Sequence, residues 1–419
     1  MPYSPEPNPA QIFTLDSGLQ VIHQYLPAAS VVVSDIWVKA GAIAEPPEWE
    51  GMAHFLEHMI FKGSDQVCPG EFDHIIENRG GTSNAATSYD YAHFFITTAR
   101  DQLSETLPHL GDILLNAAIP DEEFIRERLV VLEEINISND DPDWLAFQEL
   151  NRTLYARHPY GRSILGQEQQ LCEYTPNQMR CFHRTHYQPH NMTVSLIGNI
   201  QAEPAIELLN DVFAKFPVPA ECPPFEVEAE PPLIETRRSE VRFPNIEVSR
   251  LIMGWLCDGI DNFEDAVGLD VLSIILAGTV SSWLVQELRE KRHWVMDISS
   301  GFSLQRDSSL FTIQAWLDEA QIPDVEKLIG DRLNYLQEQT VSAVELSRAK
   351  SILCNDHIFS METPSQLAGL YGYYHTLGEL NHAHIYPQLV QRLTANDLQR
   401  LARQYLSPER CAIVTMNPC

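Results

Sequence analysis

Length, composition and charge exclude several classes of protein. The chain has 419 residues, 44% of them apolar, so it can build two domains of roughly 200 residues with real hydrophobic cores. It carries 28 basic and 58 acidic side chains, a formal charge of −30, which would repel phosphate backbones and anionic lipid headgroups. We therefore expect no nucleic-acid and no membrane partner, whereas basic or extended peptides are suitable partners.

The N-terminal segment and the cysteines predict a soluble, cytoplasmic protein. The sequence MPYSPEPNPAQ has neither the basic nor the apolar region of a secretory signal, and no later stretch offers about 18 uninterrupted apolar residues. The eight cysteines form no C-x-x-C pair. We interpret them as buried or incidental thiols rather than as a disulfide scaffold or a thiolate zinc site.

The first half of the chain alternates strands and helices. The predicted elements are a strand at 30–40, a helix from residue 51, a hairpin at 81–99, two helices within 101–138, a helix before residue 187 and a strand at 192–198. A proline-rich stretch, FPVPAECPPFEVEAEPP at 216–232, then breaks any periodic pattern. We interpret that stretch as a linker.

The second half repeats this order, which predicts an internal duplication. Its elements are a strand at 250–258, helices within 262–292, strands within 295–317, paired helices within 322–358 and a closing helix and strand. Phe124 aligns with Leu346 (346 − 124 = 222) and Thr175 with Thr394 (394 − 175 = 219), two similar offsets from separate segments. The predicted fold class is α+β, with two homologous α/β repeats at 1–215 and 233–419. Each repeat would be a mostly antiparallel sheet with helices packed on one face.

The helix from residue 51 contains two histidines, in AHFLEHMIFKG at 53–63. Its apolar residues have the spacing of a core-facing stripe: Met52, Phe55, Leu56, Met59 and Ile60. His54 and His58 lie on the opposite side, about 40° apart and flanked by Glu57, on a surface that packing does not need. Two imidazoles so placed can hold zinc while the acid takes a proton from a water. The alternative is an exposed helix with ordinary polar residues.

A third ligand is expected from the helix within PDEEFIRERLVVLEEINISNDDPDW. Its apolar face is predicted to comprise Phe124, Ile125, Leu129, Val131, Leu132 and Ile135. Glu127 and Glu134 lie two turns apart at the edge of this face, whereas Glu133 points toward solvent. We therefore prefer Glu134 as the third ligand. Glu127 would orient a histidine or tune the water, and an ordinary solvated glutamate is the alternative.

Two further groups of polar residues favour structural roles. His183, His186 and His190 could suggest another metal site, but they lie near a helix end and their repeat counterpart lacks histidine. Structural or solvated roles are therefore favoured for these histidines. The acids near residues 261–265 are expected to start a helix, where they complement its dipole.

With these residues in place, the sequence resembles the pitrilysin, insulinase and mitochondrial-processing-peptidase family of inverted zincins, in which H-x-x-E-H reverses the usual H-E-x-x-H. The family's third zinc ligand is a glutamate about 76 residues after the second histidine, and here 134 − 58 = 76. ERLVVLEEI with DDP, GGTSNAATSYD, HPYGRSILG and SSWLVQELREK also resemble family segments, across nearly the whole chain. The resemblance implies a metalloprotease LuxS/processing-peptidase-like fold. In it, the first repeat is catalytic and the second is degenerate and completes the substrate chamber.

Position by position, the resemblance implies roles for the residues of the first repeat. His54, His58 and Glu134 would bind one Zn²⁺ per chain, Glu57 would be the catalytic general base, and Glu127 would support the site.

The resemblance also implies a substrate-binding strand. Ser83, Asn84, Ala85 and Ala86 would form an edge strand to which an extended peptide adds itself through main-chain hydrogen bonds. Without the resemblance, these small residues indicate only a strand of a hairpin.

The second repeat departs from the family pattern at one position. Many members carry an arginine and, seven residues later, a tyrosine that polarises the scissile carbonyl; Arg289 matches the arginine, but Met296 stands in place of the tyrosine (296 − 289 = 7). Methionine cannot donate a hydrogen bond to an oxyanion. A second, different subunit could supply the arginine-tyrosine pair. In the family a chain near this length forms only half of a clamshell, so the resemblance implies a homodimer, or a heterodimer with a related chain that carries the pair.

The sequence thus predicts a zinc metalloendopeptidase that cleaves extended peptides or small unfolded polypeptides through a zinc-activated water and a glutamate general base. Two alternatives of the same fold stay open because of Met296: a subunit that needs a related partner for activity, and a noncatalytic assembly subunit. A peptide-binding protein with an incidental metal is less favoured, because Glu57 stands where hydrolysis needs a base.

Overall fold

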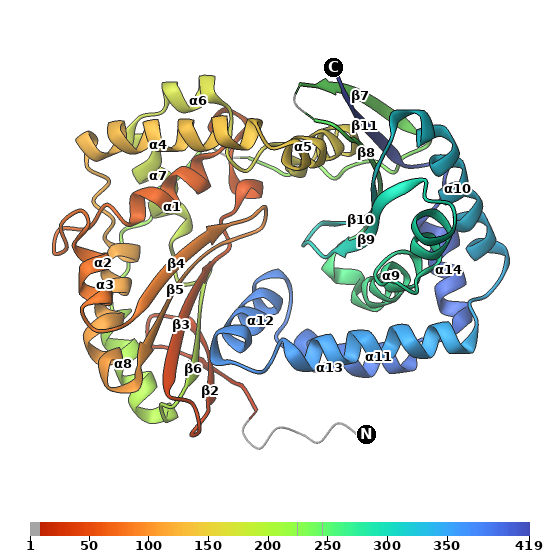
Figure 1. The fold of residues 1–419 in the computed structure, drawn as a ribbon. Coiled ribbons are helices and arrows are strands. Elements are labelled where there is room, and N and C mark those ends of the chain that lie inside the picture. Colours follow the sequence, from red (N-terminus) through yellow and green to blue (C-terminus); the bar gives the residue numbers. More distant parts are fainter. Residues whose placement is uncertain (1–8, 224, 245) are drawn as a thin grey trace. The chain divides into compact units, whose positions relative to one another are not determined.

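The chain folds into two compact units that are discontinuous in sequence (Figure 1). The computed structural model describes residues 9–223, 225–244 and 246–419. Unit 1 comprises the described residues of Met1–Ile135, Ser163–Glu226 and Phe359–Ala383, and unit 2 comprises those of Asn136–Arg162, Val227–Ile358 and His384–Cys419. The chain passes from unit 1 to unit 2 after Glu226, inside the predicted linker. A single division at 216–232 does not anticipate that 136–162 belongs to unit 2 and 359–383 to unit 1.

Unit 1 contains a six-stranded sheet in the order β1-β2-β6-β3-β5-β4. The strands are β1 (Gln11–Thr14), β2 (Gln20–Tyr25), β3 (Val31–Val38), β4 (Thr82–Thr87), β5 (Ala92–Ala99) and β6 (Met192–Gly198). Neighbours are antiparallel except for the parallel pair β2 and β6. β4 lies at the end of the order and pairs with β5 through Thr82 to Thr87.

Unit 2 contains a five-stranded sheet with the same arrangement, β7-β11-β8-β10-β9. The strands are β7 (Arg237–Phe243), β8 (Ser249–Asp258), β9 (Val295–Ser303), β10 (Ser308–Leu317) and β11 (Ala412–Pro418). One pair, β7 and β11, is parallel, and it stands where β2 and β6 stand in the first sheet. The predicted α+β fold class is confirmed, and the matching strand orders agree with two homologous repeats.

Helices lie on both faces of the first sheet, not on one face as the sequence predicts (Figure 1). Those from the first half of the chain are α1 (Met52–Ile60), α2 (Glu71–Glu77), α3 (Leu103–Leu115), α4 (Asp121–Asn139), α6 (Glu168–Glu173), α7 (Pro176–His186) and α8 (Ala202–Val212). α1 and α3 contact β5, and α8 contacts β2. The opposite face is covered by α12 (Pro364–Leu377), which contacts β3 and β6. A Cβ on Gly372 of α12 would lie 2.0 Å from Trp37 Nε1, so this approach requires glycine.

The second sheet is covered in a reciprocal way. α5 (Pro142–Leu154), from the first half of the chain, contacts β7, β8 and β11. There, Leu150 and Leu154 close over Gly254, where a Cβ would lie 3.0 Å from each side chain. The other helices of the second half are α9 (Phe263–Leu276), the π-helix η6 (Val285–Lys291), α10 (Ile322–Glu338), α11 (Ala343–Phe359), α13 (Asn381–Arg392) and α14 (Ala395–Tyr405). Each sheet therefore receives one helix from the other half of the sequence.

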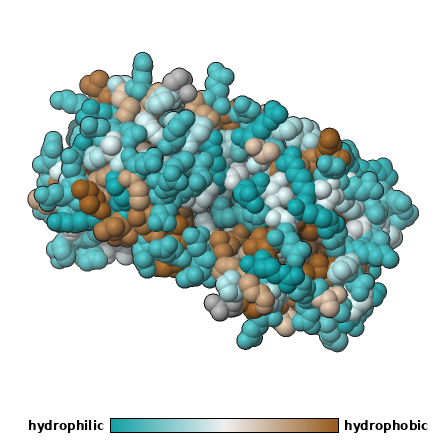
Figure 2. Space-filling view, turned by 90° about the horizontal axis from the view of Figure 1, so that it is seen from above, coloured by the Kyte–Doolittle hydropathy of each residue, from teal (hydrophilic) through white to brown (hydrophobic). Residues whose placement is uncertain are grey.

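Polar residues dominate the part of the surface that Figure 2 draws. The face drawn in Figure 2 is mostly hydrophilic, and its apolar residues form separate groups. Among the helices of the described residues, none is both long and apolar enough to span a bilayer.

Candidate metal centre

α1 is fixed at its first turn by a buried carboxylate. Gly51 precedes the helix in the left-handed region (φ +86°), which favours glycine. The Glu45 side chain accepts hydrogen bonds from the backbone N–H groups of Gly51 (2.9 Å) and Ala53 (2.7 Å). These two bonds satisfy donors that the helix itself leaves unpaired, and they set the position of the histidines that follow.

Three potential metal ligands meet between α1 and α4. Glu134 Oε2 lies 3.6 Å from His54 Nε2 and 3.4 Å from His58 Nε2. The two imidazole rings are 4.8 Å apart between centroids. In the part of the chain that the structure describes, His54, His58 and Glu134 are the one group of three such residues whose ligand atoms converge, all within 4.8 Å.

This donor set fits zinc. Two imidazoles and one carboxylate form a common set at catalytic zinc sites, where the ligand atoms lie about 2.0–2.2 Å from the ion. Tetrahedral ligands at those lengths are about 3.3–3.6 Å apart, which matches the two histidine-to-Glu134 distances. Separations of 3.4 and 3.6 Å are also too long for good hydrogen bonds, so the carboxylate faces the two rings without bonding either closely.

His58 is oriented by a chain of charged groups. Its Nδ1 lies 2.9 Å from Glu127 Oε1, and Lys62 Nζ lies 2.6 Å from Glu127 Oε2. In the neutral ring, donation from Nδ1–H to the carboxylate would leave Nε2 with its lone pair toward Glu134, the pattern expected for a metal-binding histidine. Burial opposes the charged ring, but the hydrogen bond to Glu127 and the negative charges of Glu127 and Glu134 raise the pKa of His58 to about 9. Glu127 itself is buried rather than solvated, only 7% exposed.

His54 is packed more tightly than the sequence predicts. It is 7% exposed, and nearly all of α1 is buried, so the prediction that the histidines lie on a face not needed for packing is wrong for His54. On this side α1 is approached by a side chain of α4, Glu134, whose Oε2 lies 3.6 Å from His54 Nε2. Burial, together with the nearby charge of His58, lowers the pKa of His54 to about 4. The ring is therefore neutral at pH 7, as a metal ligand must be.

Glu57 lies beside the cluster and is held by the edge strand. Thr87, at the end of β4, donates a hydrogen bond of 2.6 Å from Oγ1 to Glu57 Oε2. Burial raises the pKa of Glu57, and the hydrogen bond from Thr87 partly offsets the rise. A carboxylate with a raised pKa and one oxygen fixed by a hydroxyl is suited to accept and return a proton.

The predicted substrate strand coincides with β4. Ser83, Asn84, Ala85 and Ala86 all lie in β4, and their exposure alternates along the strand. Since β4 ends the sheet order, its outer edge has no strand partner among the described residues. The same strand ends at Thr87, in contact with Glu57.

Arg289 lies in unit 2, on the π-helix η6. Its guanidinium contacts Asp297 Oδ1 (2.9 Å) and Glu290 Oε1 (2.9 Å). Met296, on the neighbouring strand β9, is 62% exposed. Met296, which stands at the family's tyrosine position, thus lies on the surface of unit 2.

The apolar face predicted for α4 is partly wrong. Ile125 and Leu129 are 60% and 65% exposed, although both were expected in the core-facing set. The buried residues of α4 are Phe124, Glu127, Val131 and Ile135. They form a narrower stripe, in which Glu127 occupies a place that the pattern would give to an apolar residue. Glu133 is exposed, as expected.

The histidines near the end of α7 have structural contacts. His183 Nε2 lies 2.7 Å from the carbonyl oxygen of Leu114, and His186 packs on the ring of Phe182 at 4.4 Å. Burial lowers the pKa of both His183 and His186 to about 4. Neither residue belongs to the group of converging ligands found in the described part of the chain.

Two residues of the centre were missed from sequence. Lys62 is four residues after His58, one helical turn further on, and Thr87 directly follows the predicted substrate strand. Both positions could have been found by asking which neighbours of the motif carry a donor for Glu127 or Glu57.

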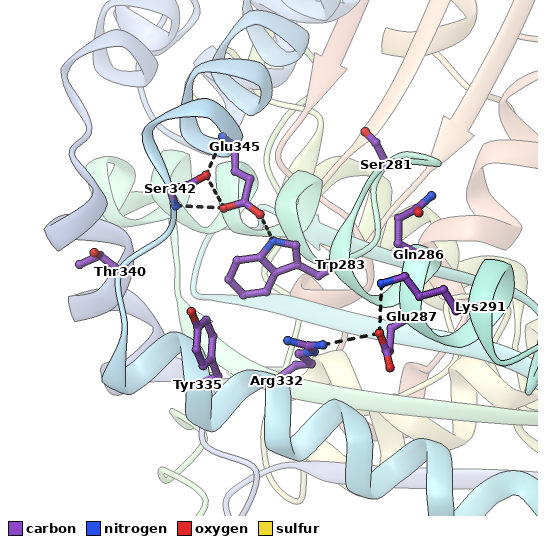
Figure 3. A pocket seen from close by; sticks show the side chains of 10 residues that line it. All are labelled: Ser281, Trp283, Gln286, Glu287, Lys291, Arg332, Tyr335, Thr340, Ser342 and Glu345. Atoms are coloured by element: carbon purple, nitrogen blue, oxygen red, sulfur yellow. Dashed lines mark hydrogen bonds and ion pairs between the residues drawn. The ribbon is translucent and has the colours of Figure 1, made fainter.

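A separate pocket of about 430 Å³ lies in unit 2 (Figure 3). Its lining is polar, and its charged groups pair with one another. Glu287 contacts Lys291 (3.5 Å) and Arg332 (3.7 Å), while Trp283 Nε1 donates to Glu345. Because these charges are already paired within the wall, the pocket does not indicate a class of ligand.

Comparisons with known proteins point to one peptidase family. The family described as "Insulinase (Peptidase family M16)" matches residues 20–168, and the one described as "Peptidase M16 inactive domain" matches residues 173–353. The zinc protease PqqE of Helicobacter pylori is 28% identical over 97% of this chain and 92% of its own length. The zinc protease YmxG of Bacillus subtilis is 27% identical over 97% of this chain and 98% of its own length.

Solved structures give the same result. The crystal structure of a protease from Helicobacter pylori has a TM-score of 0.91 and 28% identity, covering 98% of this chain and all of that one. An M16-like peptidase from Alicyclobacillus acidocaldarius shares the fold, with a TM-score of 0.87 at 20% identity and 99% coverage of each chain. With both halves of the sequence matched, the chain belongs to the pitrilysin and insulinase family of peptidases, family M16.

Proposed function

We propose that the chain is a zinc-dependent endopeptidase that hydrolyses extended peptides or small unfolded polypeptides. The observation that carries this proposal is the convergence of His54, His58 and Glu134, with Glu57 beside them. The printed names of the relatives, zinc proteases, support the same activity.

In this proposal, His54, His58 and Glu134 hold one zinc ion, and the buried Glu127 keeps His58 in the tautomer and orientation that binding needs. When bound, zinc supplies Lewis-acid polarisation to the reacting oxygen atoms.

Glu57 moves the proton. Its carboxylate takes a proton from the attacking water and later returns it to the departing amine. Thr87 restrains one carboxylate oxygen at 2.6 Å, so the other oxygen is the one available to the water. The raised pKa of Glu57 favours the return of the proton in the second half of the reaction.

The edge of β4 would align the substrate. An extended peptide that adds to Ser83, Asn84, Ala85 and Ala86 would form main-chain hydrogen bonds, with little dependence on its side chains. Because β4 ends at Thr87, which contacts Glu57, a peptide bound on this edge would run past the general base.

A partner chain is part of the proposal. Met296 offers no hydrogen-bond donor at the family's tyrosine position, and it is largely exposed. We propose that a homodimer, or a heterodimer with a related chain that carries the arginine-tyrosine pair beside the site, is the active form, with Arg289 contacting substrate. The second candidate, a noncatalytic subunit, is favoured by the same Met296.

The test is the variant Glu57→Gln. We expect it to retain zinc, because Glu57 is not a ligand, and to lose nearly all cleavage of an unstructured peptide, because an amide cannot accept the proton. Zinc content and peptide cleavage are measured on the same preparations, alone and with a related chain that carries arginine and tyrosine. Full activity of Glu57→Gln would contradict the assigned base. Zinc binding by the wild type without cleavage in either condition would favour the noncatalytic subunit.

A further inference from the structure

The connector that leaves unit 1 lies along one side of α7. Two residues of α7 and one just after its end, spaced as i, i+4 and i+7, contact the segment 217–222 in succession. Cys181 Sγ lies 3.5 Å from the carbonyl oxygen of Glu221, Thr185 Oγ1 donates to the carbonyl of Ala220 at 2.8 Å, and Gln188 Nε2 donates to the carbonyl of Pro217 at 3.1 Å. These noncovalent contacts already hold the start of the connector on α7.

At the end of this contact, two thiols meet. The sulfur atoms of Cys181 and Cys222 are 4.0 Å apart, and both residues are half-buried. A disulfide bond has an S–S length of about 2.05 Å, so closure needs a movement of about 2 Å. Cys222 lies outside any helix or strand, so its side chain and backbone can supply that movement without breaking a ladder of hydrogen bonds.

We propose that Cys181 and Cys222 are a redox-sensitive pair that forms a disulfide and fixes the start of the connector covalently to α7. The oxidant is a small-molecule disulfide such as oxidised glutathione. The Cys181 thiolate attacks one of its sulfur atoms and releases one glutathione thiolate; the Cys222 thiolate then attacks Cys181 Sγ in the mixed disulfide and releases the second. The protein loses two hydrogen atoms, and the glutathione disulfide is reduced to two thiols.

The consequence concerns the freedom of the connector. In unit 2 the carboxylate of Glu230 accepts hydrogen bonds from the backbone N–H groups of Arg157 (2.8 Å) and His158 (3.2 Å). The connector is therefore held at Cys222 on one side and at Glu230 on the other. With the disulfide closed, residue 222 can no longer leave α7, so this one of the chain's crossings between the units is held covalently at its unit 1 end.

The environment of the pair sets its rate. Burial raises the pKa of Cys222 to about 11. Since the thiolate is the reacting form, closure is expected to be slow at pH 7 and faster at pH 9.

The experiment treats the full chain with oxidised glutathione at pH 8 to 9 and then counts free thiols after denaturation. We expect the count to fall from eight to six, with a linked peptide pair that contains residues 181 and 222. Cys181→Ser and Cys222→Ser should each remove this linked pair. Cys172→Ser, a control at an exposed cysteine on α6, should leave it intact.

Hydrogen exchange gives a readout of the anchoring itself. The backbone amides of residues 218 and 220–222 should exchange at least several-fold more slowly in the oxidised wild type than in the reduced protein; residue 219 is proline and has no amide hydrogen. In Cys222→Ser, treatment with oxidised glutathione should leave these exchange rates unchanged. A persistent count of eight thiols, a disulfide between other cysteines, or equal exchange rates before and after oxidation would overturn the proposal.

Discussion

The two units carry the same order of five strands, with β1 added in unit 1, but different side chains where unit 1 has its candidate metal ligands. The offset of 222 that aligns Phe124 with Leu346 puts Ala349 opposite Glu127 and Asp356 opposite Glu134 (127 + 222 = 349; 134 + 222 = 356). Ala349 is buried in α11, as Glu127 is buried in α4. A small apolar residue therefore satisfies this helix position, and the fold itself does not require a carboxylate there.

This contrast indicates what Glu127 is for. A buried charge is costly unless it is paired and hydrogen-bonded, and Glu127 is paired with both His58 and Lys62. Burial opposes its ionisation, but His58 and Lys62 hold the pKa of Glu127 below its ordinary value. Unit 1 thus maintains a buried charged group that unit 2 omits, and that group orients a proposed ligand.

The same contrast holds for a second pair of corresponding helices, α1 of unit 1 and α9 of unit 2. α1 follows β3 in unit 1, and α9 follows β8 in unit 2. α9, FEDAVGLDVLSIIL, contains no histidine and buries most of its length. The scaffold is common to both units, whereas the group of converging potential ligands found among the described residues lies in unit 1.

Removal of the proposed carboxylate ligand should have the largest effect and tests the difference between the two units. Glu134→Gln should lower zinc affinity by at least about 100-fold and abolish peptide cleavage, because a direct ligand matters at least as much as the groups that orient it. The matched control is Asp356→Asn at the equivalent, exposed position of α11, which should leave zinc content and cleavage unchanged. Equal zinc content in the two variants would show that the units do not differ as described.

A second buried acid, Asp270 in unit 2, is held differently from Glu127 and predicts a pH dependence. Burial raises the pKa of Asp270 to about 6 from 3.8, although Tyr386 donates a hydrogen bond of 2.5 Å to it. The unfolded chain therefore ionises this group at lower pH than the folded chain does. The folded state is favoured most below about pH 4 and loses up to about 3 kcal/mol as the pH rises to 6 and above.

The variant Asp270→Asn tests this sign. Its amide oxygen can still accept from Tyr386 but cannot ionise, so the variant should be more stable than the wild type by up to about 3 kcal/mol at pH 7.5. The gain should shrink toward zero as the pH falls to 4. Urea unfolding, followed at both pH values, measures it. A stability difference that does not change with pH would show that Asp270 ionises normally in the folded chain.

The smallest expected effect comes from Thr87. Thr87→Val should lower kcat by about 10-fold, the effect of losing one hydrogen bond to a carboxylate, while zinc content stays unchanged. Thr87→Ser keeps the hydroxyl and should restore most of the activity. If Thr87→Val lost zinc as well as activity, Thr87 would be a structural residue of β4 rather than a positioning group for Glu57.

Much of the site could be predicted from sequence because it depends on local periodicity. The i, i+4 spacing of His54 and His58 and the two-turn spacing of Glu127 and Glu134 place these side chains on defined helix faces. The sequence predicts that the second half repeats the elements of the first half. It does not predict the order of the strands within either sheet, which the structure gives.

The rest depends on contacts that no local pattern encodes. The apolar stripes of α5 and α12 predict that each helix packs on something, but not that each packs on the sheet of the other half. Ile125 and Leu129 were assigned to the core because they are apolar, yet the interface with α1 is narrower and accepts Glu127 instead. Thr87 reaches Glu57 across 30 residues of sequence.

Our main proposal for this chain is that His54, His58 and Glu134 hold a single zinc ion beside Glu57. Zinc-edge X-ray absorption on the purified chain tests it most directly, since it reports the identity of the coordinating atoms. We expect one zinc per chain with nitrogen and oxygen neighbours only, at about 2.0–2.2 Å, including the scattering of two imidazole rings. Sulfur neighbours at about 2.3 Å, or a chain that takes up no zinc, would contradict it.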